Sequence, residues 1–174
     1  MTRASKISVL GTGIMGYPIA RRLCQAGFSV TVWNRTPEKA EGLKACGARI
    51  APSPQIAVAN APVIIAVLAN KLASEQVYFE QGAVKAMGPD SLLIDMATMV
   101  PDDAVQLADV VTDLGKRFVE APVSGGETGA RDGTLSIMAG GAVSDIAEAR
   151  PILTHLGRVT HVGGTGSGAV AKLC

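Results

Sequence analysis

A glycine-rich turn after the first apolar segment constrains the fold of this chain more than any other feature. Residues 6–10 form that segment, and Gly11, Gly13 and Gly16 follow with the spacing G-x-G-x-x-G before an amphipathic stretch. Gly11 allows a sharp turn, Gly13 lets a pyrophosphate approach the backbone, and Gly16 lets a helix pack close to the sheet. Free N–H groups at the helix start then favour phosphate. This context predicts a dinucleotide site, formed by Gly11, Thr12, Gly13, Ile14, Met15 and Gly16.

Strand-like and helix-like segments alternate along the whole chain. This alternation predicts a Rossmann-like, doubly wound α/β fold, with a mainly parallel sheet and helices on both faces. We expect strands at 6–10, 29–33, 49–50, 62–68, 91–95, 117–120, 134–139 and 158–162. We expect helices at 14–26, 37–46, 72–87, 101–114 and 143–156, further helices from 54 and from 169, and a glycine-rich crossing at 125–133. Residues 1–163 would form the nucleotide-binding domain, and residues 164–174 a glycine-rich turn and the start of an interdomain helix.

Composition narrows the class of partner. The chain has 174 residues, of which 48% are hydrophobic and 3% aromatic, and its formal net charge is +1. Neither nucleic acid nor a membrane surface is therefore an expected partner, and no apolar run reaches the ~18 residues of a membrane span. Three cysteines without a C-x-x-C pair, and two isolated histidines, predict neither a disulfide scaffold nor a metal site. A reducing, cytoplasmic location is expected.

The end of the second expected strand indicates which dinucleotide is bound. Asn34, Arg35 and Thr36 stand where an NAD-binding protein usually has a carboxylate for the ribose hydroxyls. The guanidinium of Arg35 can bind a 2′-phosphate through two charge-assisted hydrogen bonds, and Asn34 and Thr36 can add further hydrogen-bond donors. We therefore expect NADP, with NAD possible. The alternative is that Arg35 is a solvated loop charge and Thr36 only a helix cap.

Two motifs follow later expected strands, at the edge where open α/β sheets bind ligands. Thr98, after Asp95, could place a hydroxyl near the nicotinamide or the substrate, or both residues could merely satisfy loop backbone groups. Ser124, Gly125 and Gly126 could form a nest of N–H groups for a carboxylate or phosphate, or a plain turn.

A lysine close to the end of the chain is a candidate proton donor. We expect Lys172 in the first turn of the helix that follows the glycines at 163–168. The positive end of the helix dipole disfavours a charged ammonium there, so the side chain would release its proton more readily. The alternative is an ordinary surface charge.

Taken together, these motifs resemble the β-hydroxyacid dehydrogenase family. The fingerprint at 11–16, the Asp-Met-Ala-Thr of 95–98, the run 121–141 and the Gly-x-Gly-x-x-x-Lys of 166–172 occur in the family's order and spacing. The resemblance implies that Lys172 is catalytic and that Thr98 lies near cofactor and substrate. It implies substrate carboxylate binding by Ser124, Gly125 and Gly126, and a loop over the adenosine side that includes Leu68 and Ala69.

The implied activity is NADP-dependent hydride transfer between a small β-hydroxyacid and its semialdehyde or ketone. Ala97 stands where the family usually has serine, which removes one substrate-contacting hydroxyl and leaves the substrate open. The family's helical C-terminal domain, which forms most of its dimer, is absent from this chain, so we expect a fragment whose longer form is a homodimer or higher oligomer. Two alternatives stay open. One is a non-catalytic dinucleotide-binding module, and the other an imine reductase, a class that shares the fingerprint and the Asn-Arg-Thr turn but lacks the lysine.

Overall fold

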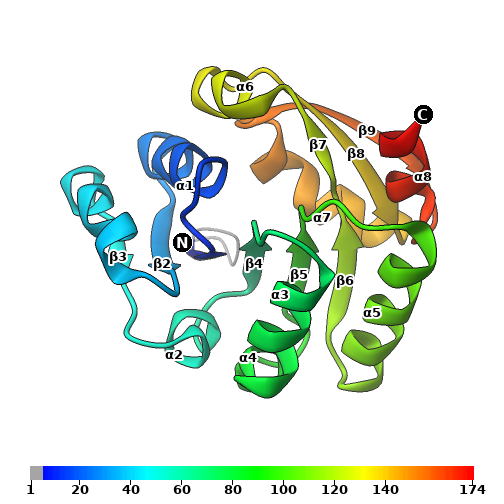
Figure 1. The fold of residues 1–174 in the computed structure, drawn as a ribbon, viewed down its shortest axis with the longest axis horizontal. Coiled ribbons are helices and arrows are strands. Elements are labelled where there is room, and N and C mark those ends of the chain that lie inside the picture. The colour runs from blue at the N-terminus through cyan, green and yellow to red at the C-terminus, as the bar shows by residue number, and fades with distance from the viewer. Residues whose placement is uncertain (1–5) are drawn as a thin grey trace.

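A single twisted sheet organises the chain, as a computed structural model that describes residues 6–174 shows (Figure 1). Within these residues the sheet has nine strands in the order β3-β2-β1-β4-β5-β6-β8-β7, with β9 paired to β8. The strands are β1 Lys6–Leu10, β2 Ser29–Trp33, β3 Arg49–Ile50, β4 Val63–Ala66, β5 Leu92–Asp95, β6 Arg117–Glu120, β7 Val123–Ser124, β8 Leu135–Gly141 and β9 Gly157–Gly163. Pairing is parallel from β3 through β6, and β8 is antiparallel to β6 and β7. The predicted Rossmann-like, mainly parallel sheet is confirmed.

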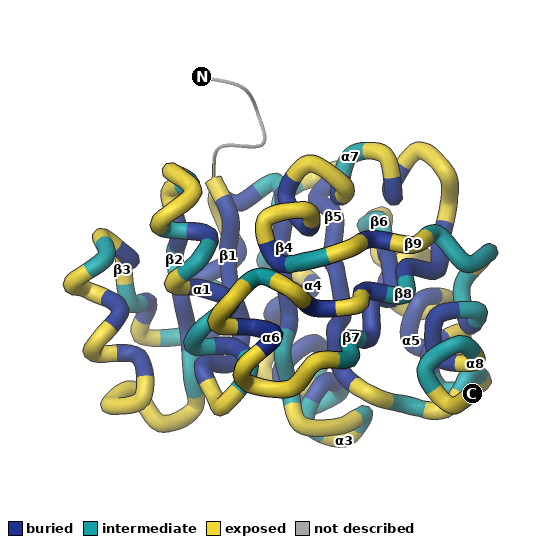
Figure 2. Tube along the Cα trace, turned by 90° about the horizontal axis from the view of Figure 1, so that it is seen from above, coloured by how far each residue is buried: buried dark blue, intermediate teal, exposed yellow. Residues whose placement is uncertain are grey.

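Helices cover both faces of the sheet, as the alternation predicted. They are α1 Gly16–Gln25, the 3-10 helix η2 Pro37–Cys46, α2 Pro54–Val58, α3 Lys71–Glu75, the π-helix η3 Gln76–Glu80, α4 Ala83–Ala86, α5 Pro101–Asp113, α6 Gly126–Asp132, α7 Val143–Leu153 and α8 Ser167–Leu173. One buried cluster joins alternate strand residues to α1, η2 and α7, and the other joins the remaining residues to α2, η3, α4 and α5. Figure 2 shows the central strands as buried tubes between exposed outer segments.

Strand β4 illustrates why a strand buried on both faces can be apolar along its whole length. Val63 and Ile65 point into one buried cluster, whereas Ile64 and Ala66 point into the other. Side chains of a strand alternate between its faces, so a strand that is covered on both faces favours apolar residues at successive positions. The expected strand 62–68 is correct in place, but the observed strand is shorter, with bounds Val63–Ala66.

Three expectations about helices need correction. The glycine-rich stretch 125–133 contains helix α6, which Ala130 anchors in the core. Glycine is a poor helix former, but Arg22 of α1 donates to the carbonyl oxygen of Arg131 and ties α6 to the body. Thr36 stands at the N-cap of η2 but makes no side-chain capping bond. Residues 72–87 are divided into α3, η3 and α4, and Gly82 precedes α4 with a positive φ of 71°.

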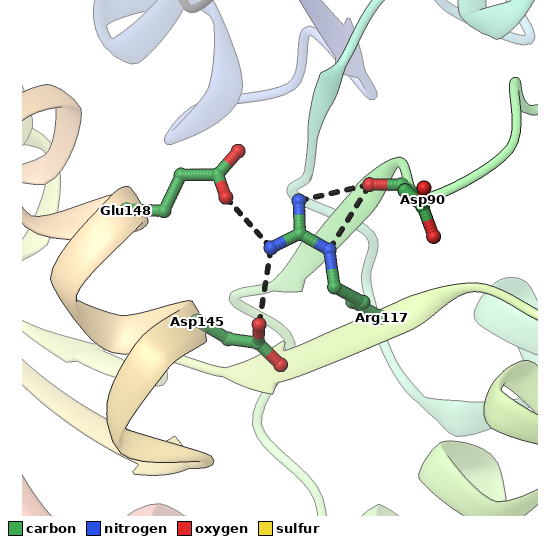
Figure 3. A network of polar contacts seen from close by, with 4 residues as sticks. All are labelled: Asp90, Arg117, Asp145 and Glu148. Carbon is green, nitrogen blue, oxygen red and sulfur yellow. Dashed lines mark hydrogen bonds and ion pairs between the residues drawn. The ribbon is translucent and has the colours of Figure 1, made fainter.

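Arg117 is the first residue of β6, at the amino ends of the parallel strands, and it links α7 to the sheet (Figure 3). Its Nη1 lies 3.1 Å from Asp145 Oδ1 and 2.6 Å from Glu148 Oε2. Its Nε and Nη2 donate to the carbonyl oxygen of Asp90 at 3.0 and 2.8 Å. Asp90 is a non-glycine residue with a positive φ of 56°, and Arg117 holds its carbonyl in place.

We predict that Arg117→Ala destabilises the protein by about 2 kcal/mol, because three partners lose charge-assisted hydrogen bonds while water partly screens the group. The measurement is the free energy of unfolding in urea. Arg131→Ala is the matched control, because the ion pair of Arg131 with Asp132 is exposed to water and its loss is expected to leave the midpoint unchanged. Equal midpoints for Arg117→Ala and wild type would contradict the prediction.

No helix within residues 6–174 is both long enough and apolar enough to cross a membrane.

Candidate active site

A cleft of about 860 Å³ lies where the parallel strands end, and it contains nearly all the predicted site residues. The chain leaves β1 toward β2 on one side and returns to β4 on the other, so this is the topological switch point at which such sheets bind ligands. Predicted residues that line the cleft are Gly11, Gly13, Ile14, Met15, Gly16, Asn34, Arg35, Thr36, Leu68, Ala69, Thr98, Ser124, Gly125, Gly126 and Lys172.

The glycine turn has the geometry that a pyrophosphate requires. Gly11 has a φ of +91°, and a Cβ there would collide with the carbonyl oxygen of Val67. A Cβ on Gly16 would collide with the carbonyl oxygen of Gly11, whereas a Cβ on Gly13 would meet nothing within 4 Å. The first two glycines are therefore needed by the fold, and Gly13 leaves open space toward the cleft. Helix α1 has no side-chain cap and no acidic residue in its first turn, so its N–H groups suit an anion.

Thr12 is the one predicted residue that does not line the cleft. It is only 2% exposed, and its backbone N–H donates to Asn34 Oδ1 at 2.8 Å. Asn34 Nδ2 in turn donates to the carbonyl oxygen of Thr36 at 2.9 Å. The amide of Asn34 thus joins the glycine turn to the loop after β2 through its oxygen and one N–H of its Nδ2 group. Arg35 is exposed at the rim.

Electrostatically, the cleft favours anions. Among the described lining residues three are basic, Arg35, Lys39 and Lys172, and none is acidic. Lys39 was not predicted; it lies in η2, and its backbone N–H donates to the carbonyl oxygen of Thr36. The sequence signal that could have identified Lys39 is its position four residues after Arg35, as a second basic residue.

The loop after β5 is held by a buried carboxylate. Asp95 Oδ1 accepts from the backbone N–H of Ala97 at 2.7 Å, and Oδ2 accepts from the Tyr78 hydroxyl at 2.7 Å and the Ser74 hydroxyl at 3.4 Å. Burial raises the pKa of Asp95, and these donors oppose the rise. Asp95 therefore satisfies the loop backbone and anchors η3 by its Tyr78, while Thr98 remains exposed on the cleft wall.

Lys172 and Ser124, 48 residues apart, meet at the other end of the cleft. Lys172 Nζ donates to Ser124 Oγ at 2.7 Å. Lys172 lies beyond the first turn of α8, so its expected position was wrong. The helix-dipole argument loses its basis, because the dipole acts within the first turn. Helix α8 packs against β8, β9 and α5, and from there the side chain of Lys172 reaches Ser124 of β7. The paired ammonium and hydroxyl can bind an oxyanion and exchange a proton with it.

Sequence reasoning missed part of the cleft wall. The remaining lining residues are Trp33, Lys39, Val67, Asn70, Leu72, Ala73, Gln76, Val77, Gln81, Met96, Ala97 and Val123. Many of these belong to the segment from the end of β4 through η3, which lies over one side of the cleft. A π-helix such as η3 often marks a functional site, but no sequence pattern here predicts it.

This sheet, glycine turn and cleft define an NAD(P)-binding Rossmann domain. Residues 6–164 match the family described as the NAD binding domain of 6-phosphogluconate dehydrogenase, and the chain belongs to that family.

Similar proteins share both sequence and fold. The chain is 39% identical over 170 residues to 3-hydroxyisobutyrate dehydrogenase of Pseudomonas aeruginosa, covering 97% of this chain and 57% of that protein. It is 35% identical over 169 residues to 2-hydroxy-3-oxopropionate reductase of Escherichia coli, covering 97% and 58%. Its structure matches Mycobacterium tuberculosis 3-hydroxyisobutyrate dehydrogenase with a TM-score of 0.94 at 34% identity, covering 98% and 58%. The chain spans less than three fifths of the length of each of these proteins.

Proposed function

We propose that this chain is the nucleotide-binding part of an NADP-dependent oxidoreductase that interconverts a small β-hydroxyacid and its semialdehyde or ketone. The observation that carries the proposal is the hydrogen bond from Lys172 to Ser124 in the cleft that also contains the glycine turn. A dinucleotide-binding module without catalysis has no need of an ammonium there. The names of the similar dehydrogenase and reductase support the same reaction class.

The residues divide the chemistry between two ends of the cleft. When bound, the cofactor supplies or accepts a hydride. The turn at 11–16 holds the pyrophosphate, and Thr98 lies between the two ends. Ser124 and the N–H groups of Gly125 and Gly126 hold the substrate carboxylate, which fixes the orientation of the reacting carbonyl. Lys172 donates a hydrogen bond to the carbonyl oxygen, stabilises the alkoxide as it forms, and gives it a proton. In the oxidative direction Lys172 takes that proton back.

The assignment to NADP rests on charge at the adenosine end. Arg35 and Lys39 are exposed at the rim beyond Asn34, and no described lining residue is acidic. A 2′-phosphate would meet two cations and no repelling carboxylate. Leu68 and Ala69 line the same cleft on the wall that follows β4.

We predict that Arg35→Ala weakens NADPH binding by about 30-fold, equivalent to about 2 kcal/mol, because a charge-assisted phosphate contact is lost. NADH binding should change less than about twofold, since NADH has no 2′-phosphate. Fluorescence titration of both cofactors gives the two dissociation constants. Arg49→Ala is the control, because Arg49 is an exposed residue of β3 that does not line the cleft. An equal loss for NADPH and NADH would overturn the assignment to NADP.

The reaction itself is tested with the full-length gene product. NADPH oxidation is followed with small semialdehydes that carry a carboxylate and with neutral aldehydes of equal length. Turnover of the acids alone supports the proposed carboxylate site. NADPH binding without turnover of any member of either set, under the same conditions, would instead identify a non-catalytic module.

The division of the chain at residue 163, a helical domain after it and a homodimer or higher oligomer formed through that domain remain predictions.

A further inference from the structure

Two segments that are distant in the sequence, residues 120–124 and 168–172, are connected by side-chain hydrogen bonds at both of their ends. Glu120 Oε1 accepts from the backbone N–H of Gly168 at 2.7 Å, and Oε2 accepts from that of Ala169 at 3.3 Å. Four residues further along each segment, Lys172 donates to Ser124. Residues 120–124 and 168–172 therefore form a closed ring, with a buried carboxylate at one end and the ammonium–hydroxyl pair at the other.

Helix α8 depends on Glu120 for its N-terminal hydrogen bonds. Its N-cap is Gly166, which has no side chain to accept from the first turn. The N–H of Ser167 is satisfied by the carbonyl oxygen of Gly164, but those of Gly168 and Ala169 go to Glu120. Orphan N–H groups of a buried first turn require such partners. The cap of the helix that carries Lys172 thus comes from β6, not from the chain next to it.

The surrounding backbone leaves space for the carboxyl group of Glu120. Glu120 is 3% exposed. A Cβ on Gly140 of β8 would collide with its Oε1, and a Cβ on Gly168 would come within 3.2 Å of its carboxyl group. Two glycines from separate elements therefore leave the space that it fills. Burial raises the pKa of Glu120, and the N–H donors of α8 oppose that rise. An unpaired carboxylate here would be costly, so the carboxylate and the helix start stabilise each other.

We propose that Glu120 is a positioning residue for Lys172: by capping the first turn of α8, its carboxylate holds the lysine in register with Ser124. The inference rests on the proposed function, in which Lys172 is the proton donor. Glu120 does not line the cleft, so it acts only through the helix. A misplacement of about 1 Å at a reacting group can cost about 100-fold in rate.

The test measures kcat, KM and NADPH affinity for Glu120→Ala in the full-length gene product. We expect kcat to fall by about 100-fold, while the dissociation constant for NADPH stays within about twofold because the glycine turn is untouched. Glu120→Gln keeps one acceptor, and kcat should fall by an intermediate factor, about tenfold. Glu127→Ala, which removes an exposed acid of α6, is the control and should leave kcat unchanged.

A second pair of variants covers the case in which Glu120→Ala does not fold. Gly168→Ala pushes against the carboxyl group and against the carbonyl oxygen of Met138, whereas a Cβ on Gly164 meets nothing within 4 Å. Gly168→Ala should lower kcat as Glu120→Ala does, and Gly164→Ala should not. Amide hydrogen exchange gives a readout independent of turnover: the amides of Gly168 and Ala169 should exchange faster in Glu120→Gln than in the wild type.

The measurements distinguish a failure of the role of Glu120 from a failure of the role of Lys172. Wild-type exchange at both amides in Glu120→Gln, or wild-type kcat in both Glu120→Gln and Gly168→Ala, overturns the role of Glu120 even if Lys172→Ala is inactive. A parallel fall in kcat and in NADPH affinity would show a general loss of structure and would also overturn it. Full activity of Lys172→Ala overturns the proposed function. In that case the amide exchange of Glu120→Gln still tests Glu120 by itself, and exchange rates equal to those of the wild type show that Glu120 does not cap α8.

Discussion

Lys172→Ala is expected to lower kcat by about 10³-fold, the middle of the range for a lost general acid–base group. The ammonium is held at 2.7 Å from Ser124 Oγ within the cleft, and no other described lining residue besides Arg35 and Lys39 carries a positive charge. Arg35 belongs to the loop after β2 and Lys39 to η2, and the proposed function assigns both to the 2′-phosphate, so we expect neither to replace Lys172. The measurement is steady-state NADPH oxidation by the full-length gene product, with cofactor affinity determined separately by fluorescence. NADPH affinity should stay within about threefold, because the glycine turn is intact.

Two further variants identify what the lysine does. Lys172→Arg retains the positive charge but cannot release a proton at neutral pH, so a role in electrostatic stabilisation alone predicts substantial recovery and a proton donor predicts little. Lys85→Ala is the control, since Lys85 is an exposed residue of α4 outside the cleft. Wild-type kcat in Lys172→Ala would contradict the mechanism proposed for this site.

Gly13→Ala is expected to weaken cofactor binding by about 30-fold, or about 2 kcal/mol, without loss of stability. A Cβ at this position meets no protein atom within 4 Å, so the fold accepts it, but it occupies the space over the turn where a pyrophosphate would lie. Gly16→Ala should behave in the opposite way. Its Cβ would collide with the carbonyl oxygen of Gly11, and we expect a loss of about 2–3 kcal/mol in the free energy of unfolding.

Gly13→Ala and Gly16→Ala together distinguish the effect of the glycine turn on cofactor affinity from its effect on stability. Urea unfolding gives the stability of each variant, and fluorescence titration with NADPH gives the affinity. Gly164→Ala, at a position where a Cβ also meets nothing, should change neither quantity. If Gly13→Ala binds NADPH like the wild type, the turn at 11–16 does not hold the pyrophosphate.

Local patterns predicted most of the sheet. The strands at 6–10, 29–33, 49–50 and 117–120 have the predicted bounds, because alternating or continuous apolar runs between glycines and prolines are a signal of neighbouring residues alone. The expected order of strands and helices likewise identified the parallel sheet and its ligand-binding edge.

Elements that depend on distant partners were missed. Helix α6 forms in a glycine-rich stretch because Arg22 and the core hold it. The π-helix η3 is anchored by the Tyr78 hydroxyl on Asp95, a bond across 17 residues that no local pattern indicates. Lys172 was expected in the first turn of its helix, but α8 begins at Ser167, and the backbone N–H of Gly168 in its first turn donates to Glu120, 48 residues away.

The sequence by itself determined the class of this protein, since the glycine spacing, the alternation of strands and helices and the ordered motifs are properties of adjacent residues. It also named the residues at both ends of the cleft. The tertiary structure alone decided how those residues are arranged. It placed Asn34 between two loops, added Lys39 to the cleft lining, and brought Lys172 to Ser124 on a helix whose first N–H groups donate to Glu120. The physical reason is that hydrogen bonds and burial depend on positions in space, and residues 48 apart meet only after the sheet has formed.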